Sequence, residues 1–260
     1  MIFAKPTEHL TGITLEGEFD DFYEIVDAIY RMTGDTECYD DPYLGVKNRL
    51  LGICYEIRHA YQGDRNVTLT ENGVYKELMK QNSMILPQNN VHFSVEILFP
   101  EAVFVALSVS ELYPFGRKHY SSRAMVQEEN SVFRAPRYSD YVRDQALLDL
   151  LSATILQALA DVIGADELEK LLKYRTRSFD IDDLFLHYVT HYIDKCNIEY
   201  LKTAPEKRKD KLRNIAKRIV QKPASYQKMK RELEYAALEY DCSIYELCDP
   251  KLEYPEKFEW

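Results

Sequence analysis

The sequence has none of the short motifs that mark the common nucleotide-binding and hydrolase sites. It contains no GxxxxGK[ST] phosphate loop, no GxGxxG dinucleotide fingerprint and no GxSxG nucleophile elbow. The HExxH motif of zinc proteases is missing, and no Arg stands five to seven positions before a His, as it does in helical ribonucleases of the HEPN type. These absences argue against each of those enzyme classes, and no motif in the chain defines a chemistry.

Cysteine is sparse and irregularly spaced. The five residues are Cys38, Cys54, Cys196, Cys242 and Cys248, an odd number with no CxxC pair. This pattern disfavours a disulfide framework. The opening MIFAKPTEHL has no charged segment followed by an apolar run, so we expect no secretory signal and a reducing, cytoplasmic setting.

Charge is unevenly distributed along the chain. The formal net charge is −10, yet Lys202–Arg231 holds twelve Lys and Arg against two acidic residues, a local charge of +10. The remaining residues therefore carry −20. The positive charge of this segment is either neutralised by acidic residues within the fold or faces an acidic partner.

The first 113 residues predict a small antiparallel sheet with covering helices. β-prone runs separated by turn residues are expected as strands at Met1–Pro6, Thr11–Glu16, Asn66–Thr70 and Val91–Leu98. Apolar residues at helical spacing predict helices at 20–32, 43–62, 74–81 and 100–112, the last with a strand as its alternative. Gly63 is expected to adopt the left-handed backbone conformation that commonly ends a helix, and so to end the second one.

The second half predicts a helical bundle around Ala146–Ile163, in which only five of eighteen residues are clearly polar. Two Asp and a Gln inside this run argue against a membrane span and for a core helix. Asp149 and Asp161 share one side, which we expect to meet solvent or the basic helix Pro205–Lys222. Further helices are predicted at 166–174, 181–201, 205–221 and 223–240, and an extended tail at 249–260.

Residues 113–139 show no sustained periodicity, so they are predicted to form a loop. The expected organisation is an α+β part at 1–113, a basic connection at 114–139 and an all-α bundle at 140–260. Because the connection is not strongly linker-like in composition, the two parts can also share one core and form one continuous domain.

The first candidate site is the segment Tyr55–Arg65 at the end of the second helix. It gathers Arg58, His59, Asp64 and Arg65 within a few residues, which are side-chain types suited to acid–base catalysis or phosphate binding. The alternative is structural, because His and Arg are favoured at a helix C-terminus by the helix dipole.

The second candidate is a metal site on the predicted helix 181–201. His187 and His191 stand four residues apart, and Asp183 lies on the same arc of that helix, as in some zinc sites. A solvated polar face, with Asp183 in the first turn, is the alternative reading. No cofactor is otherwise indicated.

Basic residues form the third group. Arg117, Lys118 and Arg123 lie in the predicted loop, and Lys209, Arg213 and Lys217 lie on the helix Pro205–Lys222. They are candidates for binding an acidic protein or nucleic acid, although no RNP motif or zinc finger supports nucleic acid. Pairing with the acidic remainder of the chain is the third alternative.

The segments KPTEHLTGITLEGEFDD and LLGICYEIRHAYQGDR are similar to an uncharacterised bacterial domain family, over roughly residues 1–110. The resemblance implies a bacterial cytosolic protein and no particular mechanism. It adds weight to Arg58, His59, Gly63 and Asp64.

These observations favour a non-enzymatic interaction or regulatory protein that binds a protein partner through charged surfaces and Tyr-rich edges. The 20 Tyr residues support it, since Tyr combines an apolar ring with a polar tip and suits interfaces. The alternative is an enzyme that acts on a phosphate-bearing or nucleic-acid substrate through Arg58, His59 and Asp64. Enzymatic activity and oligomeric state both stay open at this stage.

Overall fold

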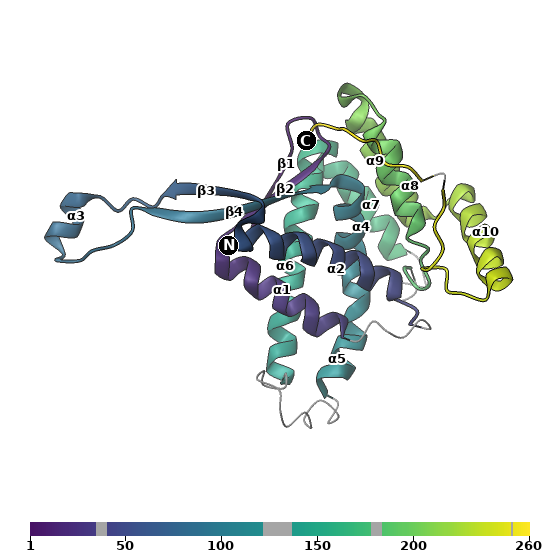
Figure 1. The fold of residues 1–260 in the computed structure, drawn as a ribbon, viewed down its shortest axis with the longest axis horizontal. Helices are drawn as coiled ribbons and strands as arrows, with labels where there is room; N and C mark the ends of the chain where they lie inside the picture. The colour runs from purple at the N-terminus through teal and green to yellow at the C-terminus, as the bar shows by residue number, and fades with distance from the viewer. Residues whose placement is uncertain (35–40, 122–136, 178–183, 251) are drawn as a thin grey trace.

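The computed structural model describes residues 1–34, 41–121, 137–177, 184–250 and 252–260, and the fold is α+β (Figure 1). Its sheet has four antiparallel strands in the order β1-β2-β4-β3. The strands are β1 (Phe3–Pro6), β2 (Gly12–Gly17), β3 (Asn66–Glu71) and β4 (Asn89–Leu98). The predicted small antiparallel sheet is confirmed, and each predicted strand is present.

The helical elements of the first half are α1 (Phe19–Thr33), α2 (Leu44–His59), the π-helical turn η1 (Ala60–Asp64), α3 (Lys76–Gln81), α4 (Phe99–Ser108), the 3-10 turn η2 (Val109–Leu112) and α5 (Tyr113–Ser121). Several of them pack against the sheet, whereas α3 lies at the far end of the β3–β4 strand pair (Figure 1). Residues 99–108 are helical, as predicted in preference to a strand. Pro100 lies in the first turn of α4, where its missing N–H costs no hydrogen bond.

The second half is helical. Its elements are α6 (Tyr138–Ile163), α7 (Ala165–Arg177), α8 (His191–Leu201), α9 (Pro205–Gln221) and α10 (Ala224–Tyr240). Beyond α10 the described chain continues without helix or strand, and its end returns to the sheet, where the His9 N–H donates to the Trp260 carbonyl at 3.2 Å.

Helix α6 runs through the middle of the molecule and contacts α1, α4 and β1 (Figure 1). Its buried Leu148, Leu151 and Ile155 belong to the same apolar cluster as Phe22 of α1 and Phe104 of α4. By length and composition alone α6 could cross a membrane, but packing of this kind is typical of the core helix of a globular protein. The helix therefore organises both halves of the chain.

Both acidic residues singled out on α6 are exposed, as expected. Asp149 accepts a hydrogen bond from the Tyr113 hydroxyl at 2.6 Å, and Asp161 accepts one from Gln157 at 3.0 Å. Their partners do not come from Pro205–Lys222. A third carboxylate, Asp144, is the one that is fully buried.

The predicted loop at 113–139 is wrong over its described ends, because residues 113–121 form α5 and α6 begins at Tyr138. Residues 122–136 lie outside the described residues. The apolar pattern of α5 is short, with Gly116 and Tyr120 buried on one side. A Cβ at Gly116 would overlap the Met32 sulfur of α1, so this helix depends on a tertiary contact rather than on a sequence periodicity.

The predicted helix at 181–201 is wrong over residues 184–190, and residues 181–183 lie outside the described residues. The chain turns at Leu184–His187, where His187 has a positive φ of 47° and its N–H donates to the Pro42 carbonyl at 2.7 Å. A left-handed residue ends any helix that contains it. The apolar Phe185, Tyr188 and Val189 are buried because they enter the core, not because they share a helix face.

Candidate functional site

The predicted cluster at the end of α2 is partly assembled. The π-helical turn η1, with Gly63 at the predicted positive φ, brings Asp64 Oδ2 to 2.8 Å from His59 Nδ1. Arg65 is held away from this pair by two hydrogen bonds to Glu56 Oε2, at 3.0 and 2.8 Å. Arg58 points toward α1, where its Nη1 donates to the Tyr30 hydroxyl at 3.2 Å.

The His59–Asp64 pair is partly exposed. The Asp64 side chain is 57% exposed and the His59 side chain is 23% exposed. Exposed ion pairs contribute at most about 1 kcal/mol, and catalytic acid–base groups usually depend on desolvation to tune their pKa. The cluster therefore has the geometry of a binding surface, and its catalytic role stays a prediction.

A tyrosine-rich surface adjoins this cluster. We call it the aromatic patch and define it as Phe19, Tyr23, Tyr30, Tyr55 and Tyr61, contributed by α1, α2 and η1. The Phe19 ring lies 5.9 Å from Tyr23 and 5.2 Å from Tyr61, and the Arg58 guanidinium lies 5.5 Å from the Tyr55 ring centre. Four of the five rings are more than 40% exposed. Tyr and Arg are the residues most enriched at the energetic centres of protein interfaces.

The sequence did not predict the most distinctive surface. Residues 66–93, which we call the arm, comprise β3, α3 and the first half of β4. Figure 1 shows the arm extending away from the body with α3 at its far end. All six residues of β3 are exposed, and no residue of α3 is buried.

One side of the arm is apolar over the part nearest the sheet, up to the pair Leu69 and Val91, beyond which Glu71 and Asn89 are polar. In the body, the side chains of β2 and β4 that face the helices are Ile13, Leu15, Val95 and Ile97, all buried. Because alternate residues of a strand share a side, the same side continues along the arm. There, the half-buried Phe93 pairs with Val67, and Val91 pairs with Leu69. Val67 is 48% exposed, Val91 43% and Leu69 69%.

The far end of the arm is also apolar. Met79, Met84 and Ile85 line a shallow hollow there, and the Ile85 side chain is 98% exposed. The opposite side of the arm carries Thr68, Thr70, Asn90 and His92. The arm is therefore amphipathic, and no described part of the body covers its apolar side.

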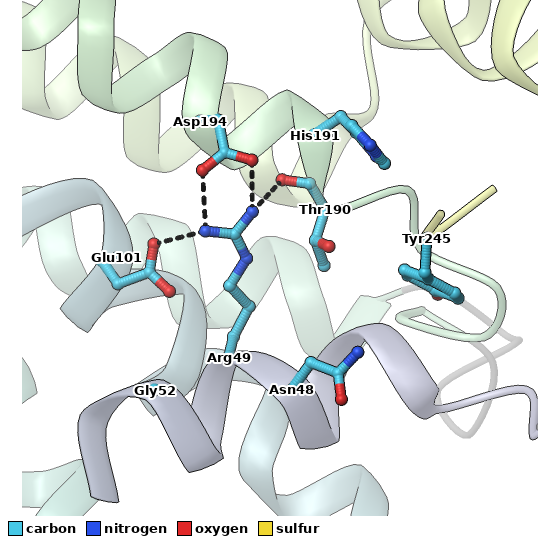
Figure 2. Close-up of a pocket in the computed structure, with 8 residues that line it drawn as sticks. All are labelled: Asn48, Arg49, Gly52, Glu101, Thr190, His191, Asp194 and Tyr245. Carbon is cyan, nitrogen blue, oxygen red and sulfur yellow. Dashed lines mark hydrogen bonds and ion pairs between the residues drawn. The ribbon is translucent and has the colours of Figure 1, made fainter. Parts of the chain in front are cut away.

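A polar cleft of about 340 Å³ lies elsewhere, between α2, α4 and α8 (Figure 2). At its centre, the Arg49 Nη1 donates to Glu101 at 3.0 Å and to Asp194 at 2.9 Å. Its Nη2 donates to the Thr190 carbonyl at 2.8 Å and to Asp194 at 2.5 Å. Sequence reasoning missed this network, because residues 49, 101 and 194 come together only through the fold.

The network leaves Arg49 unavailable to an anionic ligand, because both of its terminal nitrogens are bound by protein oxygens. Burial raises the pKa of Glu101, although Arg49 and Asn197 act against that shift. Tyr254 donates to Asp194 at 3.0 Å, so the network also ties down the C-terminal segment. The arrangement is that of a partly buried ion cluster that joins elements of both halves of the chain.

Much of the predicted basic surface is paired internally. Arg213 lies 2.9 Å from Asp210, and Lys217 lies 3.2 Å from Glu167 of α7. Lys209 and Arg117 are exposed. The Lys118 side chain and Arg123 lie outside what the structure describes.

The premise of the metal site is wrong, because His187 precedes α8 and does not share a helix face with His191. The His191 Nε2 donates to the Leu247 carbonyl at 2.9 Å, and His187 is exposed on the preceding turn. Asp183 lies outside the described residues. Among the residues that are described, no group of three His, Cys, Asp or Glu side chains is arranged to hold a metal ion.

A family model described as a domain of unknown function (DUF6904) matches residues 2–260. The expected resemblance to an uncharacterised domain family is thus confirmed, and the match extends well beyond the first 110 residues. No curated protein and no solved structure matches the chain.

Proposed function

The chain belongs to the domain family of unknown function DUF6904, whose description assigns no activity, and we propose from its geometry that it is a non-enzymatic protein-interaction module. The setting we propose is the bacterial cytosol. The arm is the element that engages a protein partner, through its apolar side. The observation that carries this proposal is the continuation of the core-facing side of the sheet onto an arm that no helix covers within the described part of the chain.

A solvated arm of this composition is unfavourable without a partner. An isolated two-stranded hairpin is marginally stable in water, and large exposed apolar patches on soluble proteins generally mark interaction sites. If the arm were exposed only to water, polar side chains would be more favourable than the apolar ones of Val67, Leu69 and Ile85. Their apolar character is explained when another protein surface covers them.

The enzymatic alternative depends on the His59–Asp64 pair. The exposure of Asp64 and the location of the pair outside the residues that line the cleft make it the weaker proposal. The arm and the aromatic patch supply a larger surface than the His59–Asp64 pair does, and both consist of residue types that stabilise protein interfaces.

Photo-crosslinking in the living cell tests the proposal. A benzophenone side chain placed at Leu69 should form covalent adducts with protein upon irradiation. The same group at Leu238, which lies on α10 and is 83% exposed, serves as the matched control and should give few adducts. Equal yields at the two positions, or none at Leu69, would contradict the proposal.

A further inference from the structure

The outer edge of β3 is the starting point for identifying the partner. β3 is the last strand in the order β1-β2-β4-β3, so one row of its backbone N–H and C=O groups has no neighbouring strand among the described residues. Natural edge strands are usually protected by charge, Pro or a covering segment. β3 contains no Pro and has one charged residue, Glu71 at its end. It is an open template for strand addition.

This inference rests on the proposed function: we infer that the partner at the arm is a second copy of this chain, joined by antiparallel pairing of β3 with β3 across a two-fold axis. A two-fold contact requires a surface that is complementary to itself. An antiparallel strand edge meets this requirement, because each strand offers the other the same donors and acceptors.

The side-chain pattern of β3 selects a register. Residues directly opposite each other in an antiparallel pair point to the same side of the sheet. Placing Thr68 on the two-fold axis sets Val67 opposite Leu69 of the other copy, so that the apolar sides of the two arms join. Thr68 then meets Thr68 on the polar side, which is a favourable pairing in sheets. Glu71 stays outside the paired segment in this register.

Charge permits this contact. The whole chain carries −10, and two such bodies would repel each other. The arm has two Lys and two Glu, at 76, 80, 71 and 77, and is neutral. Contact through the arms therefore joins the neutral segments of the two copies.

The available area is sufficient for a specific dimer. Antiparallel pairing of β3 carries the far end of each arm past Asn66 of the other copy, toward the aromatic patch at the root of that arm. The Asn90 side chain bonds Glu18 directly before α1, which places Phe19 beside that root. The exposed apolar side chains of the arm, together with Phe19 and Tyr23, amount to roughly 700 Å² per copy, against about 800 Å² per partner in a standard interface.

Sedimentation equilibrium of the purified full chain tests the inference. At tens of micromolar, the expected species is a dimer of twice the 30.5 kDa chain mass. Leu69→Glu should raise the dimer dissociation constant by about tenfold or more, because it places a charge in the joined apolar side. Leu238→Glu, an equally drastic change at an exposed Leu of α10, should leave the constant unchanged. Circular dichroism confirms that both variants fold.

A cysteine at the proposed axis tests the register. Thr68→Cys should form an intermolecular disulfide under mild oxidation, because directly opposed residues lie within bonding distance of each other. Thr70→Cys should form little intermolecular disulfide, since the two copies of residue 70 lie four residues apart along the strand pair. Wild-type chain under the same conditions measures the background from native cysteines.

The outcomes are separable. A dimer that Leu69→Glu dissociates supports the inference, and so does a disulfide that forms at residue 68 and not at residue 70. A monomer at about 100 µM, or a dimer indifferent to Leu69→Glu, overturns it. If the benzophenone at Leu69 then crosslinks to a different protein, the proposed function stands without the second copy. If it crosslinks to nothing, both fail.

Discussion

Asp144 is a buried charge that the fold satisfies completely. Its two carboxylate oxygens accept hydrogen bonds from Arg31 at 2.6 and 2.8 Å, and the Tyr120 hydroxyl donates to it at 2.5 Å. Burial raises the pKa of Tyr120 well above its ordinary value, which keeps that hydroxyl a donor. These contacts link α6 to α1 and α5.

Asp144→Asn should therefore lower the free energy of unfolding by about 3–5 kcal/mol, because it leaves the Arg31 guanidinium without its buried counterion. Urea denaturation measures this change. Asp149→Asn on the same helix is the control and should cost about 0.5 kcal/mol or less, since Asp149 is exposed. Similar losses for both variants would contradict the role assigned to Asp144.

Glu199 gives a prediction about pH. Burial acts to raise the pKa of Glu199, but hydrogen bonds from Arg218 and Lys211 outweigh that effect and lower the pKa to about 2. A carboxylate with a lowered pKa in the folded state stabilises the fold above its ordinary pKa of 4.5 and loses that contribution as the pH falls toward 2.

Glu199→Gln should accordingly destabilise the protein by about 1–2 kcal/mol at pH 7, since it removes two charge-assisted hydrogen bonds. The difference from wild type should shrink as the pH is lowered from 4.5 toward 2. Urea titrations at several pH values test this, with Glu239→Gln on the exposed surface of α10 as control. A difference independent of pH would refute the assignment.

Among the elements, α9 shows how a basic helix can be neutralised by its own fold. Its Lys211 and Arg218 pair with Glu199 of α8, and Lys217 pairs with Glu167 of α7. Arg208 is buried, and its guanidinium donates to the Thr203 and His9 carbonyls. Few of its cations are left to neutralise phosphates.

We therefore expect only weak binding of nucleic acid. In fluorescence anisotropy with a 20-nucleotide duplex at physiological salt, the dissociation constant should be weaker than about 10 µM, in the range of non-specific binding. Submicromolar binding that weakens steeply with salt would revive the nucleic-acid alternative.

Local sequence patterns predicted an element correctly where the apolar positions of the pattern are the positions that the fold buries. β4 and the apolar part of α6 have strong, correctly phased patterns, and both were placed from the sequence. The predicted helix at 181–201 is too long, because the buried residues before His191 recur at helical spacing although His187 adopts a left-handed conformation. α5 was missed because its packing depends on Gly116 fitting against Met32.

Among the candidate sites too, the sequence predicted what depends on neighbouring residues and missed what depends on the fold. Asp64 and His59 could be paired from the sequence because five residues and one glycine turn separate them. The Arg49 network could not, since its members lie up to 145 residues apart. The arm was predicted as two strands and a helix, but its exposure depends on where the helical layer ends, which no local pattern encodes.

On the scale of the whole molecule, the body and the arm differ in what holds them together. The body has one apolar cluster to which both halves of the chain contribute around α6. The arm contributes to that cluster only at its root, through the half-buried Phe93. It follows that the stability of the body does not depend on the arm.

Replacing residues 69–91 with Asn-Gly should test this separation. Thr68 and His92 face each other in the sheet, so a two-residue turn between them closes a short hairpin of favourable geometry. Because the deleted residues are exposed or only partly buried, the melting temperature should change by no more than about 4 °C, as expected for less than about 1 kcal/mol in a chain of this size. Differential scanning calorimetry measures it, and sedimentation equilibrium of the same variant should show a monomer. A large loss of stability would mean that the arm belongs to the core of the fold rather than to its binding surface.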